Sequence, residues 1–117
     1  MPPSASAKKL AAAIPAWQGV PYLWGGGSKA GIDCSGYVCE LYREIGISIP
    51  RATAELSNGS QGHAVRDELH YGDILVFPGH CALYTGNGWT TEAMHPTVGK
   101  AAIWSRTNVA IRRFTRL

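Results

Sequence analysis

The fold of this chain is decided by the stretch Gly31-Ile32-Asp33-Cys34-Ser35-Gly36-Tyr37-Val38. From Cys34 onward, apolar or small residues recur at helical spacing as far as Ile45, and Gly46 then ends the pattern. Asp33 is a good N-cap residue, so Cys34 is expected in the first turn of the helix. The positive end of a helix favours a thiolate, which makes Cys34 a candidate nucleophile.

Two segments precede this stretch. Met1 to Ser6 is rich in Pro, Ser and Ala and is expected to fray, whereas Ala7 to Trp17 predicts a short helix that stops near Pro15. The segment Gly19 to Gly27 contains a proline and three consecutive glycines, which exclude a regular helix. It is expected to form a loop that approaches another backbone closely.

The second half of the chain is strand-like. Ile47 to Arg51 is expected to be extended, and Ala52 to Gly59 to form one or two helical turns. Five strands are predicted beyond them: Asp73–Phe77, His80–Tyr84, Trp89–Ala93, Ala101–Trp104 and Val109–Phe114. Thr85 to Gly88 indicates a hairpin, because Asn-Gly favours turns with positive φ. Helices followed by antiparallel strands predict an α+β fold, with one domain over residues 1–117.

Composition excludes several classes of protein. With 117 residues, of which 45% are hydrophobic, the chain can bury one core. The net charge of +3 is scattered, so a nucleic-acid partner is not expected, although an anionic polymer would suit it. No N-terminal signal opens the chain, and no apolar run approaches the length of a membrane span. Three cysteines cannot all pair, and Cys39 and Cys81 are expected to be core residues.

A cysteine nucleophile needs a base within hydrogen-bond reach and a third polar group that orients the base. His80 begins an apolar strand, whereas His63 and His70 lie among polar residues and are expected on loops. The third group is expected on the next strand, where Glu92 and His95 are candidates. The hairpin alone does not choose between them, because a one-residue shift of register moves every side chain to the other face.

Several blocks of the sequence resemble, in order, the NlpC/P60 family. These blocks are Pro21 to Gly26, Gly31 to Val38, Ile49 to Arg51, Tyr71 to Phe77 and His80 to Gly88. The resemblance covers roughly Trp17 to Arg113. Its most specific feature is Asp-Cys-Ser-Gly at a helix start, preceded by Tyr-x-Trp-Gly-Gly and followed by a strand that begins with histidine.

The resemblance implies a papain-like fold, in which the catalytic helix packs on an antiparallel sheet. It implies a cysteine peptidase that cuts amide bonds in peptidoglycan stem peptides, with the D-γ-glutamyl to diamino-acid bond as the favoured target. Cys34 is then the nucleophile and His80 its base. Asp33 and Ser35 match substrate-binding positions, and Tyr22 matches a tyrosine that assists the oxyanion.

The third catalytic position departs from the family pattern. The family commonly has a histidine twelve positions after the base, and in this chain that position is Glu92. A carboxylate can also orient an imidazole and stabilise its charged form, so Glu92 is predicted as the third residue, with His95 as the alternative. Cys81 occupies a position that is usually aliphatic.

Two other functions are weighed against hydrolysis: a binding module that has lost catalysis, and a lipid-directed acyltransferase. The presence of Cys34 and His80 argues against the first, and their order, Cys before His, argues against the second. A monomer without metal or cofactor is expected, acting on the bacterial cell wall. Three delivery routes fit: a phage component, an interbacterial toxin with an immunity protein as partner, or a trimmed secreted hydrolase.

Overall fold

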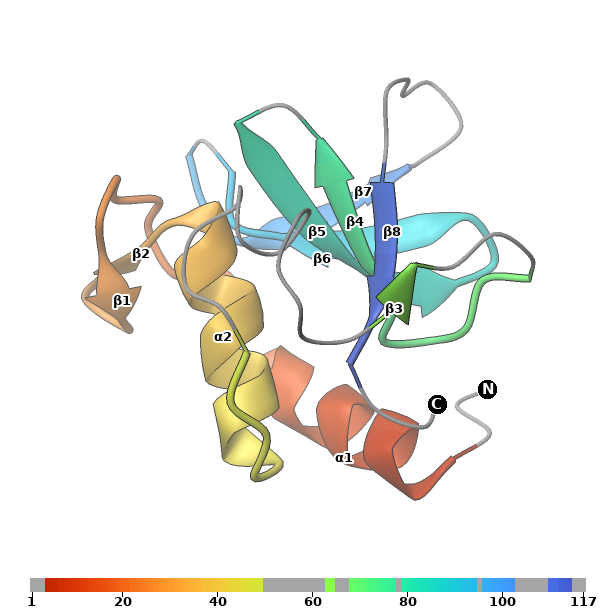
Figure 1. The fold of residues 1–117 in the computed structure, drawn as a ribbon. Helices are drawn as coiled ribbons and strands as arrows, with labels where there is room; N and C mark the ends of the chain where they lie inside the picture. Colours follow the sequence, from red (N-terminus) through yellow and green to blue (C-terminus); the bar gives the residue numbers. More distant parts are fainter. Residues whose placement is uncertain are drawn as a thin grey trace.

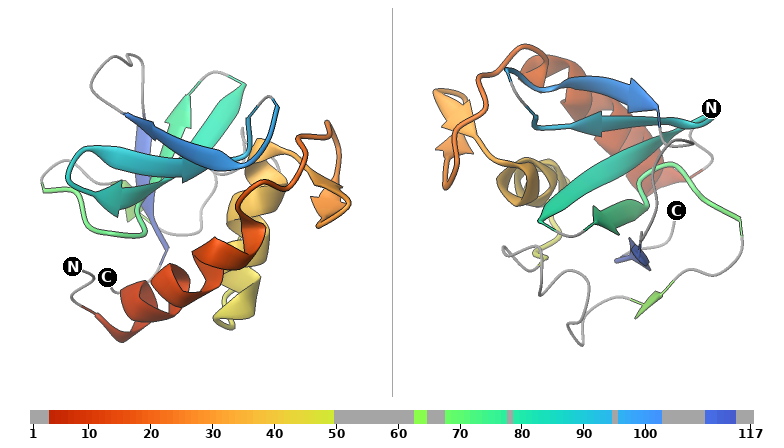
Figure 2. Two further views of the ribbon diagram at one scale, coloured as in Figure 1. Left: turned by 180° about the vertical axis from the view of Figure 1, so that it is seen from behind. Right: turned by 90° about the horizontal axis from the view of Figure 1, so that it is seen from above.

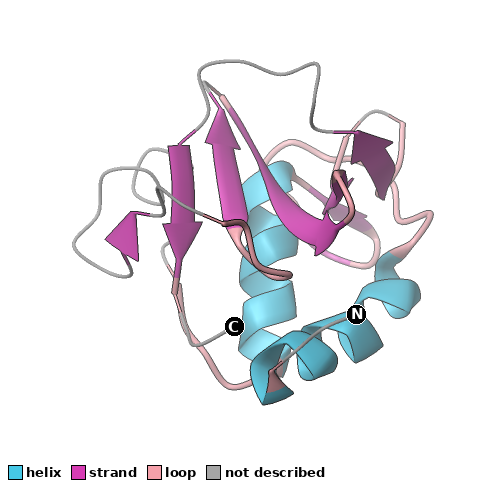
Figure 3. Cartoon of the chain, turned by 90° about the vertical axis from the view of Figure 1, so that its right-hand side faces the viewer, coloured by secondary structure: helices cyan, strands magenta, loops and turns pink. Residues whose placement is uncertain are grey.

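The computed structural model describes residues 4–49, 63–64, 68–77, 79–94, 96–102 and 110–114. Two helices, α1 and α2, lie on one side of a twisted antiparallel sheet (Figures 1 and 2). The arrangement of helices and strands is seen from the side in Figure 3. The α+β class predicted from the order of the elements is confirmed.

Helix α1 (Ala5–Ala13) begins earlier than the sequence predicts. Ser4 caps it, because its side-chain oxygen accepts a hydrogen bond from the Ala7 N–H at 3.0 Å. Residues 4 to 6, which were expected to fray, therefore form the start of the helix. Pro15 has no N–H to donate, and the chain continues from Ile14 to Trp17 as a 3-10 turn, η1.

The loop after η1 approaches another backbone as closely as its glycines predict. A Cβ atom on Gly26 would lie 2.4 Å from the carbonyl oxygen of Gly31, so no other residue fits without movement. The segment ends in a small antiparallel hairpin of β1 (Gly27–Ser28) and β2 (Gly31–Ile32). This hairpin leads directly into α2.

Helix α2 (Cys34–Glu44) has the predicted start and stop. Asp33 is its N-cap, and Gly46 follows it with a φ of +87°, a conformation that suits glycine. Four side chains on one face are buried in the main core: Tyr37, Val38, Leu41 and Tyr42. This face packs against β5 and β6, which fixes the helix on the sheet.

The described strands of the main sheet lie in the order β3-β8-β4-β5-β6-β7. Their bounds are β3 His63–Ala64, β4 Ile74–Phe77, β5 His80–Gly86, β6 Trp89–Glu92, β7 Gly99–Ala102 and β8 Ala110–Arg113. The C-terminal strand β8 thus pairs with β4 rather than with β7, its predecessor in the chain. His63, expected on a loop, begins the short edge strand β3, while His70 lies outside regular structure as predicted.

Alternation along the strands gives the sheet two apolar faces. Ile74, Val76, Cys81 and Leu83 pack with the helices. Leu75, Phe77 and Ala82 form a smaller cluster on the opposite face. The two clusters follow from the alternation of successive side chains between the two faces of a strand.

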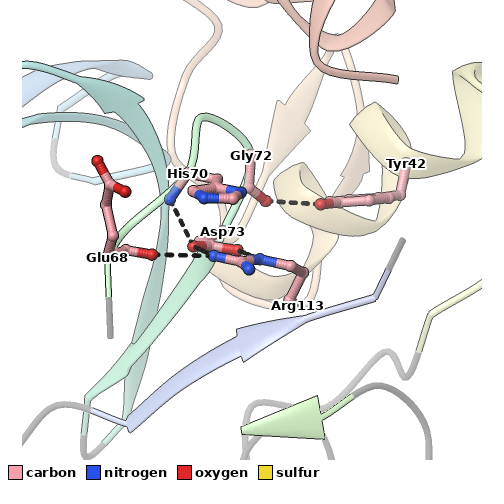
Figure 4. Close-up of polar contacts among 6 residues, drawn as sticks. All are labelled: Tyr42, Glu68, His70, Gly72, Asp73 and Arg113. Carbon is pink, nitrogen blue, oxygen red and sulfur yellow. Dashed lines mark hydrogen bonds and ion pairs between the residues drawn. The ribbon is translucent and has the colours of Figure 1, made fainter. Parts of the chain in front are cut away.

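A buried ion pair ties β8 to the start of β4 (Figure 4). The guanidinium of Arg113 donates to both oxygens of the Asp73 carboxylate, with both N···O distances 2.7 Å. The same carboxylate accepts from the His70 N–H at 2.7 Å, and the Tyr42 hydroxyl donates to the Gly72 carbonyl oxygen at 2.6 Å. Helix α2, the loop before β4 and the last strand are thereby held together.

Some sequence predictions fall outside the described residues. These are the extended segment beyond Ile49, the helical turns of Ala52 to Gly59, His95, and residues 103–104 and 109 of two predicted strands. Strand β7 begins two residues earlier than predicted. Among the residues that the structure describes, no helix has the length and apolar character needed to cross a membrane.

We expect Asp73→Ala to lower the free energy of unfolding by about 3 kcal/mol, because Arg113 loses its buried partner. Chemical denaturation followed by circular dichroism measures this loss. Glu40→Ala is the matched control, since it breaks the ion pair to Arg43, whose side chain is 73% exposed, and little change is expected. Equal losses in the two variants would contradict a stabilising role for the buried pair.

Candidate active site

Cys34 is the first residue of α2 and is buried, with 7% of its surface exposed. The side chain of the preceding residue, Asp33, accepts two backbone hydrogen bonds. One carboxylate oxygen accepts from the Gly36 N–H at 2.7 Å, and the other accepts from the Gly25 N–H at 3.0 Å. The N-cap therefore also fastens the glycine loop beside Cys34, and both features position the thiol at the positive end of the helix.

His80 is the first residue of β5, and its side chain is hydrogen-bonded to that of Cys34. Its other contact is with Glu92, whose Oε1 lies 2.7 Å from Nε2 of the ring. The ring also stacks on Phe77, with 6.1 Å between centroids. The imidazole is thus held between a thiol and a carboxylate, and Nδ1 is the nitrogen left to face Cys34.

The surroundings of His80 favour its protonated form. Hydrogen bonds to Cys34 and then to Glu92 raise the pKa of His80 to about 9, and partial burial of the ring opposes this rise. At neutral pH the His80 ring is therefore a positively charged imidazolium, with a proton on both nitrogens. A charged imidazolium next to Cys34 stabilises a thiolate, which is the reactive form of cysteine.

Glu92 is the last residue of β6 and is almost completely buried, with 1% of its surface exposed. Its Oε1 contacts His80, and its Oε2 accepts a hydrogen bond from the hydroxyl of Thr90. A buried carboxylate is costly unless it is paired and hydrogen-bonded, and Glu92 has both kinds of partner. The contact between His80 and Glu92 that the sequence predicts is present.

A β-bulge explains why Glu92 reaches His80. Gly86 pairs with Trp89, but Tyr84 pairs with Thr90, so Thr85 is an extra residue on β5. Beyond the bulge the register places Glu92 opposite Ala82, on the same face as His80. Without the extra residue, Glu92 would lie opposite Leu83 on the helix-facing side, and position 95 would lie opposite His80.

Tyr22 lies close enough to Cys34 for an electrostatic interaction between the two side chains. Burial raises the pKa of Tyr22, and the negative charges of Cys34 and Asp33 raise it further. The phenol therefore keeps its proton and can donate a hydrogen bond near the thiol. Ser35, in the first turn of α2, is buried beside the same site.

The structure brings together Cys34, His80 and Glu92. Asp33 and Ser35 lie at the start of α2, and Tyr22, in the segment after η1, lies near Cys34. Sequence reasoning missed the contribution of Thr90 and the bulge at Thr85. The available signal for Thr90 is its place two residues before Glu92, on the same face of a strand. For the bulge at Thr85 the sequence offers little signal, because the extra residue becomes apparent only when the pairing of β5 with β6 is known.

This arrangement has the parts of an acyl-transfer site. A thiol at a helix N-terminus can attack a carbonyl carbon, a neighbouring imidazole can move the proton, and a buried carboxylate can fix the ring. Serine and cysteine hydrolases on unrelated folds use the same division of roles.

Comparisons with known proteins identify chains of similar sequence and similar fold. The model of the NlpC/P60 family matches residues 19–113. The chain is 36% identical over 92 residues to the gamma-D-glutamyl-L-lysine dipeptidyl-peptidase of Bacillus subtilis, covering 71% of this chain and 30% of that protein. It is also 36% identical over 99 residues to the Escherichia coli murein DD-endopeptidase and LD-carboxypeptidase MepS, covering 79% and 50%. The chain thus spans half or less of the length of these two relatives.

Solved structures show the same fold. The peptidoglycan hydrolase RipB of Mycobacterium tuberculosis superposes with a TM-score of 0.84 at 27% identity, covering 96% of this chain and 66% of RipB. RipD of the same organism, described as a non-catalytic NlpC/p60 domain protein, superposes with a TM-score of 0.82 at 23% identity, covering 96% and 99%. The likeness to RipD shows the fold alone.

Deleting Thr85 is expected to remove the bulge and to shift β6 by one residue, so that Glu92 moves to the helix-facing side. The contact with His80 is then lost. A crystal structure or the NMR titration of the His80 ring measures the change, and the pKa of His80 should fall. Substituting Thr85→Ser, which keeps the chain length, is the control. A deletion variant that keeps the His80 to Glu92 hydrogen bond would contradict this account.

Proposed function

The chain belongs to the NlpC/P60 family, and on that premise we propose that it is a cysteine peptidase that hydrolyses amide bonds in the stem peptides of peptidoglycan. The observation that carries the proposal is the placement of His80 between the side chains of Cys34 and Glu92. Relatives named as a γ-D-glutamyl-L-lysine dipeptidyl-peptidase and as a murein DD-endopeptidase support the choice of substrate.

The proposed reaction begins with the thiolate of Cys34 attacking the carbonyl carbon of the scissile amide. A carbon–sulfur bond forms and the carbonyl oxygen takes up the electron pair. The imidazolium of His80 then gives its proton to the amide nitrogen, the carbon–nitrogen bond breaks, and the amine leaves. The product on the enzyme is a thioester on Cys34.

Hydrolysis of the thioester completes the cycle. The neutral imidazole of His80 takes a proton from water, and the hydroxide oxygen attacks the thioester carbon. The carbon–sulfur bond breaks, a carboxylic acid is released, and the thiolate and imidazolium are restored. Glu92 keeps the ring oriented through both steps and stabilises its charged form.

Tyr22, Asp33 and Ser35 are proposed to contact the substrate. The protonated phenol of Tyr22 can donate to the developing oxyanion, since it lies near Cys34. The carboxylate of Asp33 already accepts two backbone N–H groups, and its oxygens have further lone pairs with which to accept from a substrate donor. Any substrate contact of Asp33 is therefore added to a structural role.

The favoured bond is the one between D-γ-glutamate and the diamino acid. The Bacillus subtilis relative is named for a γ-D-glutamyl-L-lysine bond, which supports this choice. MepS, at the same identity, is named a murein DD-endopeptidase and LD-carboxypeptidase, and these are different activities. Analysis of the released fragments distinguishes the two, because each cut leaves fragments of a different mass.

A binding module without catalysis is the second candidate, and RipD is an example of one on this fold. Two observations favour an enzyme in this chain. Cys34 and His80 are both present, and their side chains are hydrogen-bonded. A buried carboxylate kept beside the imidazole has a clear use in an enzyme and costs stability in a module that only binds.

Cys34→Ala is expected to lower the rate of stem-peptide cleavage by several orders of magnitude and to leave the fold intact, because it removes the nucleophile. His80→Ala should act almost as strongly. Digestion of purified peptidoglycan followed by mass spectrometry measures both. Cys39→Ala, which changes a half-buried cysteine of α2 outside the site, is the control and should remain active.

The same digestion tests the reaction class. Intact glycan strands and newly opened peptides are expected. Peptides released by the Cys34→Ala variant would rule out Cys34 as the nucleophile, and new reducing sugar ends would indicate a glycosidase instead.

Glu92→Gln is expected to lower activity on the order of 10²-fold, which is less than Cys34→Ala does, because the amide oxygen still accepts the ring N–H but carries no charge. Its basic pH limit should also fall, since the raised pKa of His80 depends partly on the carboxylate. Steady-state rates between about pH 5 and 10 measure both effects. An unimpaired Glu92→Ala enzyme would contradict the assignment of Glu92 as the third residue.

A further inference from the structure

Thr90 lies next to the site, and the proposed reaction gives it no role. It is on β6 with its side chain fully buried, and its hydroxyl donates to Oε2 of Glu92. The carbonyl oxygen of Ala101 on β7, at 3.3 Å, is a second and longer acceptor for the same hydroxyl. The Thr90 hydroxyl therefore lies closer to the Glu92 carboxylate than to the Ala101 carbonyl.

We propose that Thr90 is a positioning residue, whose hydroxyl holds the Glu92 carboxylate ionised and aimed at Nε2 of His80. The inference rests on the proposed function only in taking His80 as the base of the reaction. Thr90 itself need touch neither the substrate nor the thiol.

The burial of Glu92 is the physical reason for this role. A carboxylate with 1% exposure keeps its charge only when hydrogen-bond donors replace the lost water. His80 contacts one oxygen and Thr90 the other, so the two contacts also fix the rotation of the carboxylate plane. Removing the hydroxyl favours the neutral acid or a rotated carboxylate, and each of these weakens the bond to His80.

Of the charged groups that act on the His80 imidazole, Glu92 is the one that Thr90 contacts. Among the described residues, the titratable groups that act on His80 are Cys34 from α2 and Glu92 from β6. Tyr22 and Asp33 lie on the Cys34 side. On β7, Lys100 pairs with Thr91, so it lies on the opposite face of the sheet, where it covers the Trp89 ring.

The neighbouring residue Thr91 provides a matched control. It is also a buried threonine of β6, but it points to the helix side, where its hydroxyl lies 2.8 Å from the Tyr37 hydroxyl of α2. Thr91→Val removes a buried hydrogen bond from the same strand without touching Glu92. Any general effect of losing a buried hydroxyl should therefore appear in both variants.

The experiment measures the pKa of the His80 ring by NMR titration in a Cys34→Ala background, in which the thiol no longer contributes. Thr90→Val is expected to lower this pKa by about one unit. Thr90→Ser, which keeps the hydroxyl, should restore it, and Thr91→Val should leave it unchanged. Thr90→Ala removes the same hydroxyl and carries the same expectation if Thr90→Val does not fold.

An unchanged His80 pKa in Thr90→Val or Thr90→Ala would overturn the proposal, as would an equal fall in Thr91→Val. The titration uses no substrate, so its result does not depend on whether peptidoglycan is cleaved. With Cys34 restored, Thr90→Val should also move the basic limb of the activity profile to lower pH, and Thr90→Ser should return it.

Discussion

The hydrogen bond between His80 and the buried carboxylate of Glu92 is the interaction on which the rest of the site depends. A buried negative charge is unfavourable by itself, and the imidazolium is what makes it tolerable. Cys34 and, after it, the carboxylate raise the pKa of His80, and the contact of Glu92 with Nε2 leaves Nδ1 on the side of Cys34. Thiol, imidazole and carboxylate therefore support one another, and each is held by a different element of the fold, namely α2, β5 and β6.

The elements that carry these side chains are positioned by short-range constraints. Asp33 caps α2 and fastens the glycine loop beside it, which sets the place of Cys34. The bulge at Thr85 sets the face on which Glu92 lies. A contact between residues distant in the sequence, the ion pair of Asp73 with Arg113, joins β8 to the start of β4. The geometry of the site is thus a consequence of backbone register and capping more than of contacts among the reacting groups.

Much of this could be predicted from the sequence, because its strongest signals are local. The N-cap and glycine stop predict α2 to within a residue at each end, and the Asn-Gly turn predicts the hairpin of β5 and β6. The hairpin by itself does not choose between Glu92 and His95, since the choice depends on a single extra residue in a strand. The resemblance to the family, with its third residue twelve positions after the base, is what favours Glu92. The pairing of β8 with β4 could not be predicted either, because local sequence does not encode which distant strands pair.

The most direct test of the account is the pH dependence of Cys34 alkylation by iodoacetamide, read by peptide mapping so that Cys39 and Cys81 are counted separately. If His80 and Glu92 maintain an imidazolium beside the thiol, Cys34 should react at a constant high rate down to about pH 6. His80→Ala should move the rise in rate to the range of an ordinary thiol, near pH 8.5. The same ordinary rise in both proteins would contradict the claim that Cys34, His80 and Glu92 form one reactive unit.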